Sequence, residues 1–242
     1  MIDHYDWAGG REAMLRFGPA GGPVVIMLPA LFEEHNRTRA FAVTICRMLA
    51  ERGVASVVPD LPGQGESIVG TEDVTLTDLR SGFAAAVEHL HQEKRRVYSA
   101  SIRSGAIIDA DSHALGHWYF SPMSGQQQIA DLAKILAATG RSSEAHLLRN
   151  SYQIDDTTSA FEIAGNVISV ALLQDLTSDI GKYPMNSLGV PTRILRLDSD
   201  RAEAHRHIPG TPLWRRAEPS NDPALAALLA EDIADWIALC EA

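Results

Sequence analysis

The stretch from Tyr98 to Ala106 constrains the fold of this chain more than any other, because a strand there runs directly into a helix. Residues 95–101 are predicted to form a short buried strand, and residues 104–114, rich in Ala and Ile, a helix. No loop separates the two elements. The turn between them must therefore be abrupt, with the strand and helix backbones nearly in contact.

The residues around this turn restrict its apex. A sharp strand-to-helix turn of this kind, a nucleophile elbow, accepts only small residues two positions before the apex and two and three positions after it. With Arg103 at the apex, those positions hold Ser101, Gly105 and Ala106, which are all small. With Ile102 at the apex, small residues again occupy the three positions. The sequence leaves both registers open.

Serine fits the apex less well. Ser101 at the apex would place the bulky Arg103 in a small position. Ser104 at the apex would place Ile102 and Ile107 in two such positions. The registers that fit therefore present neither a hydroxyl nor a thiol, and an attacking serine would require a distorted turn. The other interpretation of this stretch is an ordinary strand-to-helix connection without a function.

Strands and helices alternate along most of the chain, which predicts a mostly parallel, doubly wound sheet. Two β-like runs around Gly9-Gly10 predict an N-terminal hairpin. The predicted strands are residues 1–7, 11–17, 23–28, 54–58, 95–101, 116–121, 191–197 and 202–208. The predicted helices of this part are residues 36–52 (with Asn36 as N-cap), 76–91, 104–114 and 223–240. In such a sheet the loops after the strands converge on one rim.

Between residues 124 and 183 the alternation stops. Helical runs at 126–138 and 172–180 flank a polar stretch and a short β-like piece at 160–164. We interpret residues 124–183 as a small helical cap inserted into a single domain that spans residues 1–242, a length that suits one α/β domain.

The composition restricts the partners. A formal net charge of −10 argues against general nucleic-acid binding, which normally uses a basic face. No apolar run reaches the roughly 18 residues of a membrane helix, and the N-terminus lacks the pattern of a signal peptide. Cys46 and Cys240 are interpreted as reduced thiols, so we expect a cytoplasmic protein. No P-loop, dinucleotide fingerprint or metal-ligand spacing occurs, so we expect no cofactor and no metal.

The order of the elements resembles the α/β-hydrolase fold over essentially the whole chain. The segment Asp-Leu-Pro-Gly-Gln-Gly-Glu-Ser, residues 60–67 after the fourth predicted strand, strengthens the resemblance. The resemblance implies a nucleophile at the elbow, an acid after a late strand and a histidine in the loop before the last helix.

Five shorter segments resemble, in the same order, the exosortase A system-associated hydrolases of the second class. They are residues 29–39 with Glu-Glu-His-Asn-Arg-Thr-Arg, 101–106 with Ser-Ile-Arg-Ser-Gly-Ala, 122–127 with Pro-Met-Ser-Gly-Gln-Gln, 161–165 with Phe-Glu-Ile-Ala-Gly, and 210–214 with Gly-Thr-Pro-Leu-Trp. The resemblance implies an association with bacterial exopolysaccharide and protein-sorting loci. Ser101 stands where that family prefers glycine, which crowds the elbow slightly.

A hydrolase triad also needs an acid and a base within hydrogen-bond reach of the nucleophile. Asp200, just past a late predicted strand, fits the acid position, with Asp198 as the alternative. The loop that normally carries the base, residues 209–216, contains no histidine. His205 and His207 come earlier, on the predicted last strand, so either would be a displaced base.

Arg103 changes the chemistry expected at the elbow. An arginine stays protonated at physiological pH, so it cannot attack a carbonyl as a base-activated nucleophile. It could clamp a carboxylate or phosphate beside the helix N-terminus. It could instead form an internal ion pair with Glu33 or Glu34, and we favour this second interpretation.

We therefore expect an α/β-hydrolase-like protein without Ser-hydrolase activity that uses its cleft for binding or assembly. The alternative is an atypical ester or acyl hydrolase in which a carboxylate activates water or a displaced serine attacks. A small anionic, acyl or glycan ligand is expected, and a homodimer stays open. The expected site residues are Arg103, Asp200, His207 and Glu34 in catalytic positions, with Leu31, Glu33, Asn36, Ser101, Ser104, Ser124 and Trp214 lining the cleft.

Overall fold

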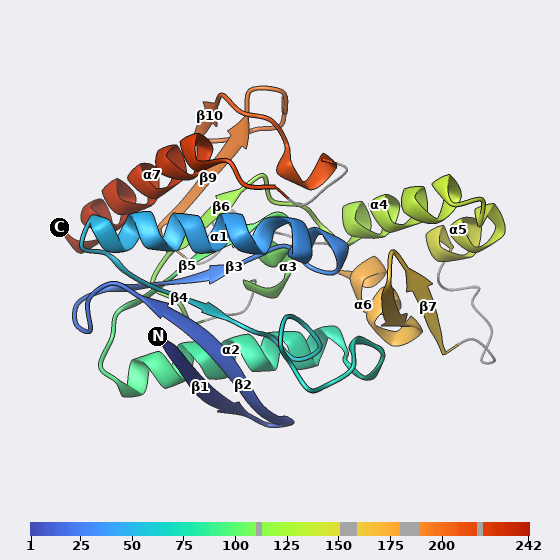
Figure 1. The fold of residues 1–242 in the computed structure, drawn as a ribbon, viewed down its shortest axis with the longest axis horizontal. Helices are drawn as coiled ribbons and strands as arrows, with labels where there is room; N and C mark the ends of the chain where they lie inside the picture. The colour runs from blue at the N-terminus through green and yellow to red at the C-terminus, as the bar shows by residue number, and fades with distance from the viewer. Residues whose placement is uncertain (110–112, 151–158, 180–188, 217–219) are drawn as a thin grey trace.

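The fold is organised around one large sheet, shown in Figure 1. The computed structural model describes residues 1–109, 113–150, 159–179, 189–216 and 220–242. The strands of this sheet are β1 (Ile2–Trp7), β2 (Gly10–Phe17), β3 (Val24–Leu28), β4 (Ala55–Pro59), β5 (Val97–Ile102), β6 (His117–Phe120), β9 (Thr192–Leu197) and β10 (Arg206–Ile208). Their order is β1-β2-β4-β3-β5-β6-β9-β10.

The sheet is mostly parallel, as the alternation of strands and helices predicts. Neighbouring strands from β4 to β10 run parallel. The N-terminal hairpin is confirmed, because β1 and β2 pair antiparallel from Ile2–Leu15 to Trp7–Gly10. Strand β2 also pairs antiparallel with β4 and so attaches the hairpin to the parallel part.

Helices cover both faces of the sheet. Helices α1 (Glu33–Glu51) and α7 (Pro223–Glu241) pack against each other on one face, and α2 (Leu76–Gln92) with the short α3 (Gly105–Ile108) covers the other (Figure 1). No helix in the described part of the chain is long and apolar enough to cross a membrane.

Strand β3 shows how the core is divided between the two faces. All five of its residues are buried, as predicted for a continuous apolar run between two helix layers. Val25 and Met27 pack in a cluster with Phe41 of α1 and Ile233 of α7. Ile26 joins the cluster under α2 on the opposite face. Successive side chains of β3 therefore pack against the helices on opposite faces of the sheet.

Helix α1 begins four residues earlier than the sequence predicts. Asn36 was expected at the N-cap, but the helix starts at Glu33 and Asn36 is exposed inside it. Phe32 holds the cap position with a φ of 56°, and its N–H donates to Gln64 Oε1 at 3.2 Å. Glu33 and Glu34 then lie in the first turn, where the helix dipole favours acidic side chains.

Two predicted elements are shorter in the structure. The helix predicted for 104–114 is described as α3 over four residues, while residues 110–112 lie outside the described part of the chain. The last strand was predicted over 202–208 and covers only 206–208. Asp200 explains the later start, because its Oδ1 accepts from the Ala202 N–H at 3.0 Å and closes a turn there.

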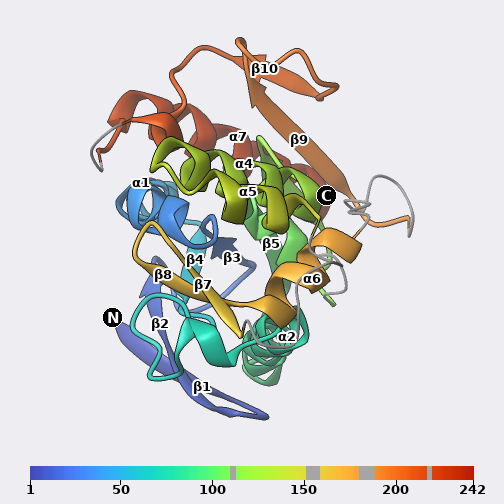
Figure 2. The same ribbon diagram turned by 90° about the vertical axis from the view of Figure 1, so that its right-hand side faces the viewer.

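An insertion occupies the chain between β6 and β9. It contains α4 (Gly125–Ala138), α5 (Ser142–Arg149), the hairpin β7 (Ala160–Ile163) and β8 (Asn166–Ser169), and α6 (Val170–Ser178). Sequence patterns predicted α4, β7 and α6 but not α5 or β8; the predicted end at Tyr183 lies outside the described residues. Figures 1 and 2 show the insertion gathered at one end of the sheet.

A buried network fixes the loop after β4. Asp60 accepts from Arg39 Nη1 at 2.5 Å, and its carbonyl oxygen accepts from the Tyr5 hydroxyl at 2.7 Å. His35 Nε2 lies 3.1 Å from Arg39 Nη1. Gly65 has a φ of 62°, and a Cβ there would lie 2.1 Å from Asp60 Oδ1. This close approach requires glycine in the loop.

Candidate functional site

Arg103 occupies the apex of the strand-to-helix turn. Its φ of 55° lies in the left-handed region, which residues other than glycine rarely adopt. Ile102, the other apex allowed by the sequence, is the last residue of β5 and is fully buried. A Cβ at Gly105 would lie 2.6 Å from the Leu28 carbonyl oxygen, so the helix starts in close contact with β3.

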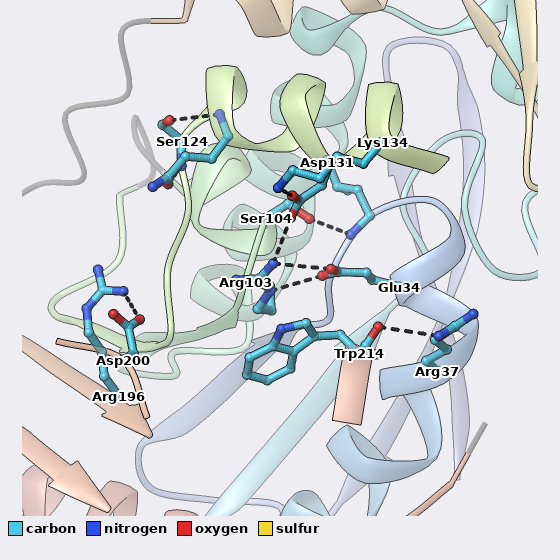
Figure 3. Close-up of polar contacts among 12 residues, drawn as sticks. Glu34, Arg37, Arg103, Ser104, Ser124, Asp131, Lys134, Arg196, Asp200 and Trp214 are labelled. Atoms are coloured by element: carbon cyan, nitrogen blue, oxygen red, sulfur yellow. Dashed lines mark hydrogen bonds and ion pairs between the residues drawn. The ribbon is translucent and has the colours of Figure 1, made fainter. Parts of the chain in front are cut away.

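The Arg103 guanidinium is enclosed by three side chains (Figure 3). Its Nε and Nη2 donate to the two carboxylate oxygens of Glu34 at 3.1 and 3.2 Å. Nη2 also lies 3.4 Å from Asp131 Oδ2 on α4. The guanidinium carbon is 4.6 Å from the centre of the Trp214 ring, within cation–π range. Arg103 therefore joins α1, the inserted segment and the loop before α7.

Glu34 is the internal partner of Arg103. Burial raises the pKa of Glu34, and the nearby Arg103 guanidinium lowers it without cancelling the effect of burial. Glu33, the other acid that the sequence offers, forms an ion pair with Arg37 instead. The Arg37 guanidinium also donates to the Trp214 carbonyl oxygen at 3.4 Å and so ties α1 to the ring that covers Arg103.

Backbone donors beside the elbow already have acceptors. In elbow hydrolases, N–H groups after the nucleophile and in the loop after β3 stabilise the oxyanion that forms during the reaction. Here the Leu31 N–H donates to Ser104 Oγ at 2.9 Å, and the Phe32 N–H donates to Gln64 Oε1 at 3.2 Å. Leu31 and Ser104 are both buried. Side chains of the protein thus occupy the donors of this loop.

Ser101 belongs to a buried polar cluster beneath the elbow. Its Oγ lies 3.4 Å from Asp109 Oδ2, the same oxygen that accepts from Ser99 Oγ at 2.6 Å. His117 Nδ1 lies 3.0 Å from this oxygen and 2.9 Å from Ser99 Oγ. All four residues are buried. The cluster brings a serine, a histidine and an aspartate together, but inside the protein and not at the cleft.

Asp200 is paired with an arginine rather than a histidine. Its Oδ2 accepts from Arg196 Nη1 at 2.7 Å (Figure 3). Partial burial raises the pKa of Asp200, but the Ala202 N–H and the Arg196 guanidinium outweigh it and hold the pKa below its ordinary value. Asp198, the alternative acid, is exposed.

The two candidate base histidines make other contacts. His207 is exposed on β10, and its Nε2 lies 3.1 Å from the Ala202 carbonyl oxygen. His205 Nδ1 accepts from the Ile194 N–H at 3.0 Å. Within the described residues, neither histidine hydrogen-bonds to Asp200 or to Arg103. The base position of a triad is therefore not assembled from these side chains.

Trp214 lines two hollows. One is a cavity of about 280 Å³, called here the elbow cavity, lined by Arg103, Ser121, Asp200, Arg201, Trp214 and Arg215 among others. The second is a groove of about 460 Å³ between α1 and α4, lined by Glu33, Glu34, Arg37, Asp131, Lys134 and Trp214 among others. Asn36 is not among the residues that line either one.

Ser124 acts as a helix cap at the start of the inserted segment. Its Oγ accepts from the Gln127 N–H at 3.2 Å, and its own N–H donates to Gln127 Oε1 at 2.8 Å. We expect Ser124→Ala to lower the free energy of unfolding by about 1 kcal/mol in urea titrations, the usual cost of losing such a cap. Ser142→Ala is the matched control, because α5 starts without a side-chain cap; an equal loss there would contradict the assignment.

One group of side chains in the described residues has a geometry compatible with a metal. Ligand atoms of Asp3, His89 and Glu93 lie within 4.8 Å of one another, near the N-terminal hairpin. The Arg16 guanidinium, however, forms ion pairs with both carboxylates. Arg16 thus offsets part of the negative charge of this group.

Comparison with known proteins decides the fold. No family model and no curated protein matches the chain. Among solved structures, Est1E from Butyrivibrio proteoclasticus, with ferulic acid bound, has a TM-score of 0.64 and 16% identity over 98% of each chain. A haloalkane dehalogenase loop variant from Bradyrhizobium elkanii has a TM-score of 0.61 and 14% identity over 100% of this chain and 97% of that one.

A third similar structure is an AqdC variant in complex with its substrate, the Pseudomonas quinolone signal, whose ring it cleaves. Its TM-score is 0.63, with 14% identity over 98% of this chain and 99% of that one.

The chain has the α/β-hydrolase fold. The fold predicted from the sequence is confirmed, and at these identities the likeness concerns the fold alone.

On this α/β-hydrolase fold the site contains residues that the sequence did not single out. Asp131, the second carboxylate near Arg103, lies on the inserted helix α4, and spacing along the chain does not indicate where that helix sits. Ser121, Arg201 and Arg215 come from three separate loops. The rule that loops after parallel strands converge places Ser121 and Arg201 near the cleft, but it does not select them.

Proposed function

We propose that this α/β-hydrolase-fold protein binds a ligand or partner in its cleft and does not hydrolyse esters through a serine. The observation that carries the proposal is Arg103 at the elbow apex with both oxygens of Glu34 on its guanidinium. Arginine keeps its charge at physiological pH, so the apex offers a cation and no attacking oxygen. Loss of a nucleophile in a working triad costs on the order of 10⁶ in rate.

Two further features support the proposal. The Leu31 and Phe32 N–H groups donate to side chains of the protein, so the loop after β3 offers fewer donors to a developing oxyanion. Trp214 covers Arg103 from the loop in which α/β hydrolases keep their base. These features are consistent with a cleft that recognises a molecule and leaves it chemically unchanged.

The resemblance of five sequence segments to exosortase A system-associated hydrolases supports a setting for this role. The protein would act in an exosortase-linked exopolysaccharide or protein-sorting system, on the cytoplasmic side of the membrane. Two of these segments, residues 101–106 and 210–214, contain Arg103 and Trp214, which contact each other in the structure. The two residues on which the proposed binding role rests therefore belong to the segments that resemble the exosortase-associated family.

One observation favours a second candidate, an ester or acyl hydrolase that activates water. Burial raises the pKa of Glu34, and a carboxylate with a raised pKa is better suited to take up a proton near neutral pH. Both oxygens of Glu34 already accept from Arg103, however, which leaves its proton-accepting sites engaged. We therefore place this candidate second.

A fluorophosphonate probe followed by intact-mass measurement tests the proposal directly. We expect no covalent adduct, and no turnover of short-chain p-nitrophenyl esters above the rate in buffer; a known serine esterase serves as the positive control. An adduct that disappears in Ser101→Ala or Ser104→Ala would establish a displaced serine nucleophile and refute the proposal. Ester turnover without an adduct, abolished in Glu34→Gln, would establish the water-activating candidate instead.

A further inference from the structure

We propose that the elbow cavity is a binding site for an oxyanion, either a phosphate group or a carboxylate. The proposal rests on the proposed function in one respect: the cleft binds its ligand and does not hydrolyse it. The proposal is supported by the charges that line the cavity, by a buried hydroxyl without a partner among the described residues, and by other polar groups of the lining.

The cavity carries positive charge that the described residues do not balance. Arg103 is paired with Glu34, and Asp200 is paired with Arg196. Arg201 and Arg215 also line the cavity, and neither forms an ion pair or a side-chain hydrogen bond with any described residue. Two exposed guanidinium groups at the cavity therefore have no carboxylate partner among the described residues, on a protein whose formal net charge is −10. Such a local excess attracts an anion.

Ser121 adds a donor without an acceptor. It follows β6, lines the cavity and is 2% exposed, yet its Oγ has no hydrogen-bond partner among the described residues. A buried hydroxyl without a partner destabilises the folded protein. Its φ of 47° adds backbone strain at the same residue. An anion bound in the cavity would supply an acceptor for this hydroxyl once the side chain turns toward it.

The chemistry of the cavity also suits an oxyanion. Guanidinium groups bind phosphate and carboxylate through paired N–H donors, which a halide cannot match. The volume of about 280 Å³ holds a phosphate or carboxylate together with a small organic group. Asp200 and Ser199 also line the cavity and can accept from hydroxyl groups of that remainder.

The test is isothermal titration calorimetry of the full chain with inorganic phosphate and, separately, with acetate, at constant ionic strength maintained with chloride. Saturable binding of either probe is expected, and the probe with the lower Kd identifies the preferred group. Arg215→Gln and Arg201→Gln should each weaken binding about tenfold or more, since each removes a charge-assisted hydrogen bond. Arg47→Gln, an exposed arginine far along α1, is the matched control and should bind as the wild type does.

Ser121→Ala separates a ligand contact from a structural role. The substitution removes a buried hydroxyl that has no partner, so the thermal midpoint without ligand should stay the same or rise. Phosphate or acetate affinity should fall about fivefold to tenfold, because one donor is lost. Absence of saturable binding, or an equal loss in Arg47→Gln, would overturn the anion site. A fluorophosphonate adduct would refute the non-hydrolytic function alone and would leave this titration result standing.

Discussion

Replacing Glu34 with alanine should lower the free energy of unfolding by about 3–5 kcal/mol, the usual cost of removing one partner of a buried ion pair. The guanidinium of Arg103 is only 14% exposed and would keep a single, more distant carboxylate, that of Asp131. A charge in such a position is poorly hydrated and poorly paired. Urea unfolding followed by circular dichroism measures the loss.

Two further variants make this prediction specific. Glu33→Ala is the matched neighbour: its ion pair with Arg37 is more exposed, so it should cost about 1 kcal/mol or less. The double substitution Glu34→Leu with Arg103→Met should recover most of the stability, because it removes both charges together. If Glu34→Ala and Glu33→Ala cost the same, the elbow pair would not be the structural anchor that its geometry indicates.

Acidification should destabilise the protein through His35. Burial, together with the charge of Arg39, lowers the pKa of His35 from 6.5 to about 4. Between these values the unfolded chain binds a proton that the folded protein does not, so stability falls as the pH falls through this window. The expected contribution is about 2 kcal/mol between pH 7.5 and 5, and about 3 kcal/mol by pH 4.

The measurement compares the pH dependence of unfolding in three proteins. His35→Gln carries a neutral side chain, so its free energy of unfolding should change less with pH than that of the wild type. His146→Gln, at an exposed position on α5, should follow the wild-type curve. Identical curves for the wild type and His35→Gln would show that another group controls the acid sensitivity, and the carboxylate of Asp60 in the same network would be examined next.

Features encoded locally were predicted well. The continuous apolar run of β3, the glycine pair of the hairpin and the small residues around Arg103 each specify backbone geometry within a few positions. The small-residue rule reduced the apex to two positions, and the φ of Arg103 selects between them. The sequence does not show that Glu34 rather than Glu33 pairs with Arg103, because the pairing depends on which side of the first turn of α1 faces the elbow.

Features that depend on long-range packing were not predicted. Phe32 occupies the N-cap of α1 without a capping side chain, and Gln64 of a distant loop accepts from its N–H. Asp131 approaches Arg103 only because α4 packs over the cleft. The cluster of Ser99, Asp109 and His117 joins β5, the C-terminal cap of α3 and β6, and none of the three stands out in the sequence.

The place of Trp214 has a practical consequence. Its indole ring stacks on Arg103 and lines both hollows of the cleft. The other tryptophans lie elsewhere, on the hairpin, in β6 and in α7. Indole fluorescence responds to charge in its immediate surroundings, so this protein carries its own optical reporter at the elbow. Binding of a molecule in the cleft should therefore change the tryptophan emission spectrum, so that binding can be followed without a label.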